Sequence, residues 1–496
     1  MRHARKTSIA GGFLAIALVL QGCGPDRSEG PVDVVIIGEP NSLFQQGIRL
    51  SVGAQHVRAA TMEGLVALDP AGRIVPAIAE RWIIADDGRS YIFRLRDSSW
   101  PGGEPVAAED IERTLKDLLA RLEGTSLGYD LAKLTEVRAM TGRVVELRLS
   151  SPMPDFLRLL AQPELGFVHQ GSGAGPMVMS RDDEFPIARL SALPPESRGL
   201  PARQDWEALA SPITVRSLGS TQAIEAFSNG EVDLILNGRL SNLPEVELGP
   251  LSRGAIQVDP ALGLFGLVFR REEGLLEDPE RREALSMAID RSALIEPFGL
   301  GGWQATSWIV PRELYEGRQI AASRWGDQSL DELRAIAASR IARWMSESPD
   351  REPVVSIGLP PGPGSDLLFQ GIADAWATIG VRAQKMPSGA GADVELHDRL
   401  ARYSSPRWFL NQFNCGLDIG LCSLEADALV REALEASEPL QKQALYLEAH
   451  GELLAREAFI PLGAPVRWSL VRGALQSYQP NPWGLHPLFP LSQPTT

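Results

Sequence analysis

Apolar residues along this chain follow two periods, one typical of strands and one typical of helices. Residues 32–37 (VDVVII) form a continuous run rich in β-branched residues, which predicts a buried strand. Residues 90–96 (SYIFRLR) alternate apolar and polar side chains, as a half-buried strand does, and residues 143–149 (RVVELRL) predict another strand. Between them, residues 109–122 place apolar side chains at helical spacing. These patterns predict a small unit of mixed helix and strand.

Farther along the chain, the order strand, helix, strand occurs twice. The first occurrence has strands at 213–218 (ITVRSL) and 232–236 (VDLIL) with a helical pattern between them. The second has a strand at 354–359 (VVSIGL), a helix at 366–379 and a strand at 381–383. This order is typical of an α/β layer with a parallel sheet. Two such units predict a bilobed α/β protein, an architecture that can close around a ligand by hinge motion.

Length and charge narrow the class of protein. The 496 residues exceed one ordinary domain, since domains average roughly 100–200 residues. The formal net charge is −15, which disfavours a nucleic-acid partner because neutralising phosphates requires clustered lysine and arginine. We therefore expect a multidomain globular protein that does not bind nucleic acid.

The N-terminus has the pattern of a lipoprotein signal peptide. A basic start precedes the apolar stretch 9–20, which is shorter than the approximately 20 residues of a membrane span. The sequence LQGC at 20–23 then resembles the lipobox of bacterial lipoproteins. We expect residues 1–22 to be removed, Cys23 to carry a lipid anchor, and residues 23–30 to act as a tether. The protein body is then expected in the periplasm or cell envelope. An uncleaved anchor helix is the alternative.

The expected location in the periplasm or cell envelope bears on the oxidation state of the cysteines. Besides Cys23 the chain has only Cys415 and Cys422, and an even pair in an oxidising compartment favours a disulfide. Free thiols are the alternative. A metal or redox site is disfavoured because no further cysteine or histidine stands nearby at ligand spacing.

No residue pattern typical of an enzyme occurs. The chain lacks GxSxG, HExxH, a Walker A motif and a strand followed by GxGxxG. His397 and Asp398 are adjacent and could ligate a metal, but such pairs are more often solvated. We expect no enzymatic activity, no cofactor and no bound metal.

A series of motifs resembles one known family. The stretch 63–111 contains a Gly-Leu, an Asp-Pro turn, PAIAERW, an Asp-Gly turn, YIF and WPGGEPVAAED in that order. The segments 173–179 (GAGPMVM), 226–236 (AFSNGEVDLIL) and 278–295 (DPERREALSMAIDRSALI) continue the likeness, and 459–488 resemble its closing strand and tail. Together they resemble family 5 solute-binding proteins of bacterial ABC importers, the oligopeptide, dipeptide and nickel class.

The resemblance implies a periplasmic-binding-protein-like fold: two α/β lobes joined by two chain crossings, with an extra α+β domain inserted in the N-terminal lobe. Ligand is expected in the cleft between the lobes, and the closed form is expected to dock on ABC permease subunits. We place the crossings near Phe265–Arg270 and Pro461–Arg467. The expected divisions are 31–60, 151–265 and 465–496 for lobe I, 61–150 for the inserted domain and 266–464 for lobe II.

The resemblance also indicates ligand-binding residues. Glu39 matches an acidic residue that follows the family's first strand. The segment 393–410 matches a family motif and keeps Tyr403, but Arg399 replaces a tryptophan, and Arg402 replaces the aspartate that pairs with a peptide's amino terminus. Arginine suits a carboxylate or phosphate and repels an amine. Either the anchored end of the ligand is anionic or Arg402 pairs internally with Glu39; a shifted, solvated loop is a further alternative.

Two tryptophans complete the predicted site. Trp408 and Trp303 could form aromatic walls of the cleft, although a core position is equally compatible with each. The predicted function is a substrate-binding subunit of an ABC importer for a peptide or peptide-like, anionic solute. The alternatives are a sensing or scaffolding protein of the envelope, or a periplasmic hydrolase.

Overall fold

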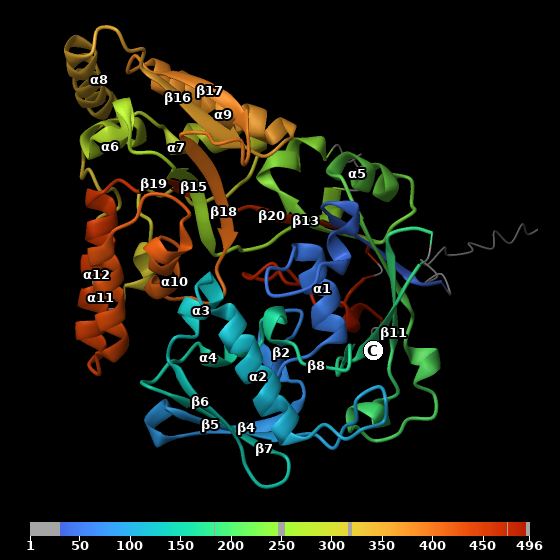
Figure 1. Cartoon of the computed structure of the whole chain (residues 1–496). Coiled ribbons are helices and arrows are strands. Elements are labelled where there is room, and N and C mark those ends of the chain that lie inside the picture. Colours follow the sequence, from blue (N-terminus) through green and yellow to red (C-terminus); the bar gives the residue numbers. More distant parts are fainter. Residues whose placement is uncertain (1–29, 183, 247–252, 316–319, 474, 493–496) are drawn as a thin grey trace, which may run out of the picture.

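The computed structural model describes residues 30–182, 184–246, 253–315, 320–473 and 475–492. The expected signal peptide, Cys23 and nearly all of the tether lie outside these residues. Figure 1 shows two lobes, each built around its own sheet, and beside them a smaller α+β part, which is called the smaller domain below. None of the helices in the described ranges combines the length and apolar character that a membrane span requires.

The sheet of the first lobe has seven strands in the order β10-β11-β12-β1-β13-β20-β14. β1 (Val32–Ile37) lies near its centre because its apolar residues are buried on both faces, between the parallel strands β12 (Ile213–Leu218) and β13 (Leu234–Arg239). Helix α5 (Ser220–Ser228) connects β12 to β13, which confirms the first predicted β-α-β unit. The lobe also contains α1 (Val52–Thr61), β10 (Met177–Arg181), β11 (Ile187–Ala192), β14 (Ile256–Val258) and β20 (Arg467–Val471).

The smaller domain contains an antiparallel sheet in the order β4-β5-β7-β6. Helix α2 (Ala108–Leu122) packs on this sheet through β6 and β7, with its apolar positions buried as their spacing predicts. The predicted strands at 90–96 and 143–149 are confirmed to within one residue. Its elements are β2 (Val66–Leu68), β3 (Ile74–Pro76), β4 (Ala79–Ala85), β5 (Ser90–Leu95), α3 (Ser126–Asp130), β6 (Leu134–Ala139) and β7 (Val144–Leu149), followed by α4 (Phe156–Leu160), β8 (Val168–His169) and β9 (Ser172–Gly173).

The sheet of the second lobe has the order β17-β16-β18-β15-β19. β16 (Val354–Leu359) and β17 (Arg382–Pro387) are parallel neighbours connected by α9 (Pro363–Ala377), which confirms the second predicted β-α-β unit. The other elements are β15 (Gly263–Phe269), α6 (Pro279–Met287), α7 (Arg291–Ile295), α8 (Leu330–Glu347), β18 (Val394–Leu400), α10 (Pro406–Asn411), α11 (Leu424–Glu435), α12 (Pro439–Ala455) and β19 (Phe459–Gly463).

The chain passes twice between these two sheets. β14 ends at Val258 in the first sheet and β15 begins at Gly263 in the second, so the first crossing lies earlier than the predicted Phe265–Arg270. All of β15 is buried because it lies between β18 and β19. Its apolar residues therefore form one continuous run, and nothing in this run marks where the chain passes from the first sheet to the second. The return occupies residues 464–466, between β19 and β20, inside the predicted range. The boundary expected at residue 265 therefore moves to the start of β15.

Candidate functional site

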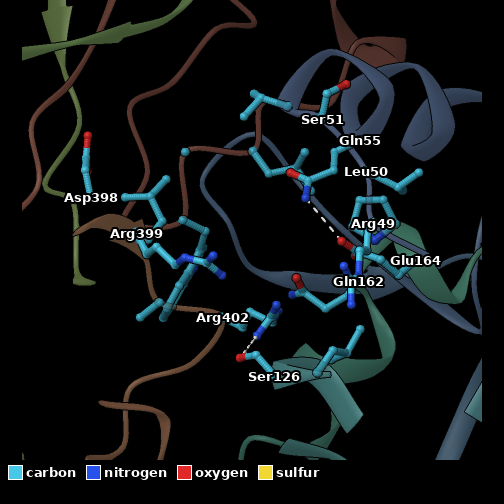
Figure 2. Close-up of a pocket in the computed structure, with 18 of the residues that line it drawn as sticks. Arg49, Leu50, Ser51, Gln55, Ser126, Gln162, Glu164, Asp398, Arg399 and Arg402 are labelled. Carbon is cyan, nitrogen blue, oxygen red and sulfur yellow. Dashed lines mark hydrogen bonds between the residues drawn. The ribbon is translucent and has the colours of Figure 1, made fainter. Parts of the chain in front are cut away.

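A cavity of about 770 Å³, which we call the first chamber, lies where the two lobes and the smaller domain meet. Its walls come from residues 48–52 beside α1, from 124–127 at the start of α3, from 398–402 at the end of β18, and from 483–486 near the C-terminus. Figure 2 shows side chains of three of these segments, 48–52, 124–127 and 398–402, around one space. The cleft predicted between the lobes is therefore present, and the smaller domain forms part of its wall.

One edge of β18 is open where this strand borders the chamber. Along its length β18 pairs with β15, but β16 reaches it only at Val394 and Glu395. Residues 396–400 thus have no strand partner on that side within the described chain. Asp398, Arg399 and Leu400 line the first chamber. An open strand edge presents backbone donors and acceptors that an extended peptide can pair with.

Asp398 connects the two lobes across this chamber. The Arg467 guanidinium, at the start of β20 in the first lobe, donates to both carboxylate oxygens of Asp398 in the second, at 2.8 and 3.0 Å. Arg239 at the end of β13 lies 3.8 Å from the same carboxylate. Asp398 is therefore neutralised within the protein, and it joins the lobes by an ion pair.

Arg402 is also bonded within the protein, which disagrees with the alternative in which it anchors an anionic end of the ligand. Its guanidinium donates to Ser126 Oγ at 3.0 Å and to Asp130 Oδ2 at 3.1 Å, both on α3. The predicted pairing with Glu39 is wrong: Glu39 is exposed and does not line the first chamber. The reason is topological, because α3 packs against α10 and brings Asp130 next to the segment that precedes α10.

Asp130 collects three donors in a site without access to solvent. Besides Arg402, it accepts hydrogen bonds from the Tyr403 hydroxyl at 3.1 Å and from Asn411 Nδ2 at 2.9 Å. Burial raises the pKa of this carboxyl, and the guanidiniums of Arg402 and Arg407 oppose the rise. Tyr403 is thus a buried residue between the smaller domain and lobe II, with its hydroxyl turned to Asp130 instead of the chamber.

Arg399 differs from Arg402 in having no bonded partner. It is exposed to the cleft, and in the described part of the chain its guanidinium forms no hydrogen bond or ion pair. Partial burial and the nearby charge of Arg402 lower the pKa of Arg399. Arg49, on the opposite wall in Figure 2, is likewise exposed and without a bonded partner among the described residues. Two unpaired guanidiniums on facing walls favour an anionic group between them.

The predicted aromatic residues take different positions. Trp408 is 1% exposed, packs edge-on against Phe409 and still lines the first chamber, so it is a core residue that forms part of the wall. Trp303 donates from Nε1 to the carbonyl of Ala464 at 2.8 Å and lies against the second crossing. Of the predicted set, the structure brings Arg399, Arg402 and Trp408 together at the chamber.

Three lining arginines were missed by the sequence analysis, namely Arg49, Arg239 and Arg467. Arg239 stands at the carboxyl end of a parallel strand, the usual place for ligand contacts in an α/β sheet, and this signal could have found it. Arg49 lies in a loop without a motif.

The predicted disulfide is confirmed, since Cys415 and Cys422 are bonded to each other. It closes a loop whose residues Leu417 and Ile419 line the first chamber. Among the described residues no three His, Cys, Asp or Glu side chains gather as a metal site. His397 and Asp398 are adjacent on β18, so their side chains point to opposite faces and cannot chelate one ion together.

Comparison with known proteins agrees with this architecture. Residues 73–190 and 202–415 match the family described as bacterial extracellular solute-binding proteins, family 5 Middle. A probable di/tripeptide-binding protein 5 of Pseudomonas aeruginosa is 23% identical over 85% of this chain and 88% of its own length. The periplasmic oligopeptide-binding protein OppA of Escherichia coli is 21% identical over 84% of each chain.

Solved structures share the fold. The crystal structure of Haemophilus influenzae OppA in complex with RPPGFSPFR superposes with a TM-score of 0.77 at 18% identity, over 92% of this chain and 98% of that one. Since the family match spans more than half of the sequence, the chain belongs to family 5 of the bacterial extracellular solute-binding proteins.

Proposed function

We propose that this protein is the solute-binding subunit of an ABC importer and captures a peptide or peptide-like, anionic solute between its lobes. The observation that carries the proposal is the open edge of β18 at residues 396–400, next to the unpaired guanidiniums of Arg399 and Arg49. The strand edge suits a peptide backbone, and the guanidiniums suit an acidic end or side chain. The names of the peptide-binding relatives support the same ligand class.

Capture in this proposal depends on closing the lobes. The ion pair of Asp398 with Arg467 and Arg239 spans the cleft and favours the closed arrangement. A ligand that contacts both lobes shifts the population further toward closure, by as much as its affinities for the two states differ. The closed form then docks on the permease subunits, and a lipid on Cys23 keeps the protein at the membrane.

Binding without turnover is part of the proposal. Family 5 consists of solute-binding proteins, and this supports a role in delivery instead of catalysis. A peptide recovered intact after prolonged incubation with the protein is the expected result, and its hydrolysis would contradict it.

A thermal-shift screen tests the proposed ligand class. Ligand-free protein, obtained by unfolding, dialysis and refolding, is mixed with di- to pentapeptides or with the same amino acids in free form. A ligand that binds only the folded protein raises its unfolding midpoint. We expect the peptides to raise the midpoint and the free amino acids not to. Loss of peptide uptake on deleting the gene then separates an importer subunit from an envelope sensor, for which uptake would be unchanged.

A further inference from the structure

A second cavity, of about 410 Å³, adjoins the first chamber and is called the second chamber below. Arg239, Asp398, Arg399 and Ile419 line both cavities, so the two are neighbours around the open edge of β18. Its other walls come from the N-terminal end of α9, from β15 and from Arg270, the residue that follows β15. A ligand lying along β18 would therefore reach from one chamber into the other.

Two buried polar groups of this chamber lack partners. Ser365, in the first turn of α9, is 1% exposed, and His397 on β18 is 7% exposed. Ser365 Oγ and His397 Nε2 form no hydrogen bond within the described residues. Leaving a buried polar group unpaired destabilises a fold, so each such group calls for a partner from outside the chain, such as a ligand, an ion or a water. Both residues line the second chamber, where a ligand could satisfy them.

Two guanidiniums of the chamber, those of Arg270 and Arg399, have no ion-pair partner among the described residues and are available to an anion. Arg270 is exposed, and in the described chain its guanidinium makes only one hydrogen bond, a 3.4 Å contact to the carbonyl of Asp418. Arg399 has no bonded partner there, as described above. Of the acidic groups in the lining, Asp398 is neutralised by Arg467, and Glu395 accepts from the backbone N–H of Gly389. The side chain of Asp418 is the remaining acid.

Helix α9 and His397 also favour binding of an anion, although neither adds a full positive charge. α9 has 15 residues, and its N-terminal end carries a partial positive charge that stabilises anions. Burial, followed by the charges of Arg399 and Arg270, lowers the pKa of His397 to about 3. The imidazole is therefore neutral at physiological pH and can donate one hydrogen bond.

We propose that the second chamber is a subsite for an anionic group of the ligand, held by Arg270, Arg399, Ser365 and His397. This inference rests on the proposed function, because it assigns one part of the same solute. A carboxylate and a phosphate share the required chemistry: both accept several charge-assisted hydrogen bonds from guanidinium and hydroxyl donors.

A competition experiment with matched peptides tests this subsite. Ligand-free protein is incubated with an equimolar pool of tri- to pentapeptides in which each sequence occurs with Glu, Gln or phosphoserine at one position, and with a free or amidated carboxyl terminus. Bound peptides are separated by gel filtration and quantified by mass spectrometry. We expect at least a tenfold excess of an acidic form over its matched neutral form, as charge-assisted hydrogen bonds imply. The form with the largest excess distinguishes a side-chain carboxylate, a terminal carboxylate and a phosphate.

Two variants and a control locate the effect. R270Q and S365A should each reduce the acidic preference at least fivefold while peptides still bind. R271Q is the matched control: Arg271 is the next residue, but it bonds the Gly391 carbonyl and does not line either chamber. Equal retention of acidic and neutral forms, or an equal effect of R270Q and R271Q, would overturn the subsite and leave peptide binding intact. Retention of no peptide at all would instead overturn the proposed function.

Discussion

Replacing Asp130 by alanine should destabilise the contact between the smaller domain and lobe II. The carboxylate is fully buried and accepts from Arg402, Tyr403 and Asn411. The side chains of Tyr403 and Asn411 are 1% and 4% exposed, so their freed donors cannot reach water. Arg402 keeps 22% of its side chain exposed and can turn into the cleft.

The loss of unfolding free energy in this variant can be estimated from how far each freed donor is buried. Each buried donor left without a partner costs about 1–3 kcal/mol. Relief from burying a carboxylate offsets part of the loss, since burial raises the pKa of Asp130. We expect a decrease of about 3 kcal/mol in the free energy of unfolding, at the lower end of the range for breaking a buried ion pair.

A double-mutant cycle in urea, followed by tryptophan fluorescence, measures whether Arg402 acts through Asp130. We expect D130A and R402A each to destabilise the protein, and the double variant to lose about 1–2 kcal/mol less than the sum. R399A is the matched control, because the exposed Arg399 has no bonded partner in the described chain and should change stability by less than about 0.5 kcal/mol. Additive effects of D130A and R402A would refute the internal pairing and leave Arg402 available to the ligand.

Three further predictions concern pH, the disulfide and closure. Burial lowers the pKa of His56 to about 4 and that of His450 to about 3, so the folded protein holds both imidazoles in the neutral form. The stability that depends on this neutral form is complete above about pH 6.5 and is lost as the pH falls toward those two pKa values. At pH 5 each should contribute about 1–2 kcal/mol less than at pH 7, and urea unfolding of H450Q should show a smaller loss than wild type; an equal loss would contradict this assignment. Exchanging Cys415 and Cys422 for serine should lower the unfolding free energy by under about 3 kcal/mol and weaken peptide binding severalfold by calorimetry, because their loop lines the first chamber; unchanged affinity would show that the loop does not need the disulfide. D398N should increase the radius of gyration of the ligand-free protein in X-ray scattering, because it removes the ion pair between the lobes; an unchanged radius would mean that this pair does not favour closure.

Local patterns predicted most elements of the fold. β1 and α2 each have a period of apolar residues that their own segment determines, and both occur where expected. The capping of α6 is equally local: Asp278 accepts from the backbone N–H of Glu280, and Pro279 follows at the first helical position. The first crossing was misplaced because β15 is apolar throughout.

The site could be predicted only in part. The unusual arginines at 399 and 402 were visible in the sequence, since they depart from a motif that the rest of the segment keeps. Their different roles were not visible. Asp130, the partner of Arg402, lies 272 residues away, and no periodicity relates two segments at that distance. Ser365 and His397 have ordinary sequence contexts, and only their burial without partners sets them apart.

The most direct test of the central claim is the identity of the natural ligand. The mature protein is purified from the cell envelope under native conditions, and the ligand released on unfolding is identified by mass spectrometry. We expect peptides in near-stoichiometric amount, each with a free carboxylate or phosphate, and their loss from a variant in which Arg399 is replaced by glutamate. A released ligand without peptide bonds, or peptides with no acidic group, would contradict it.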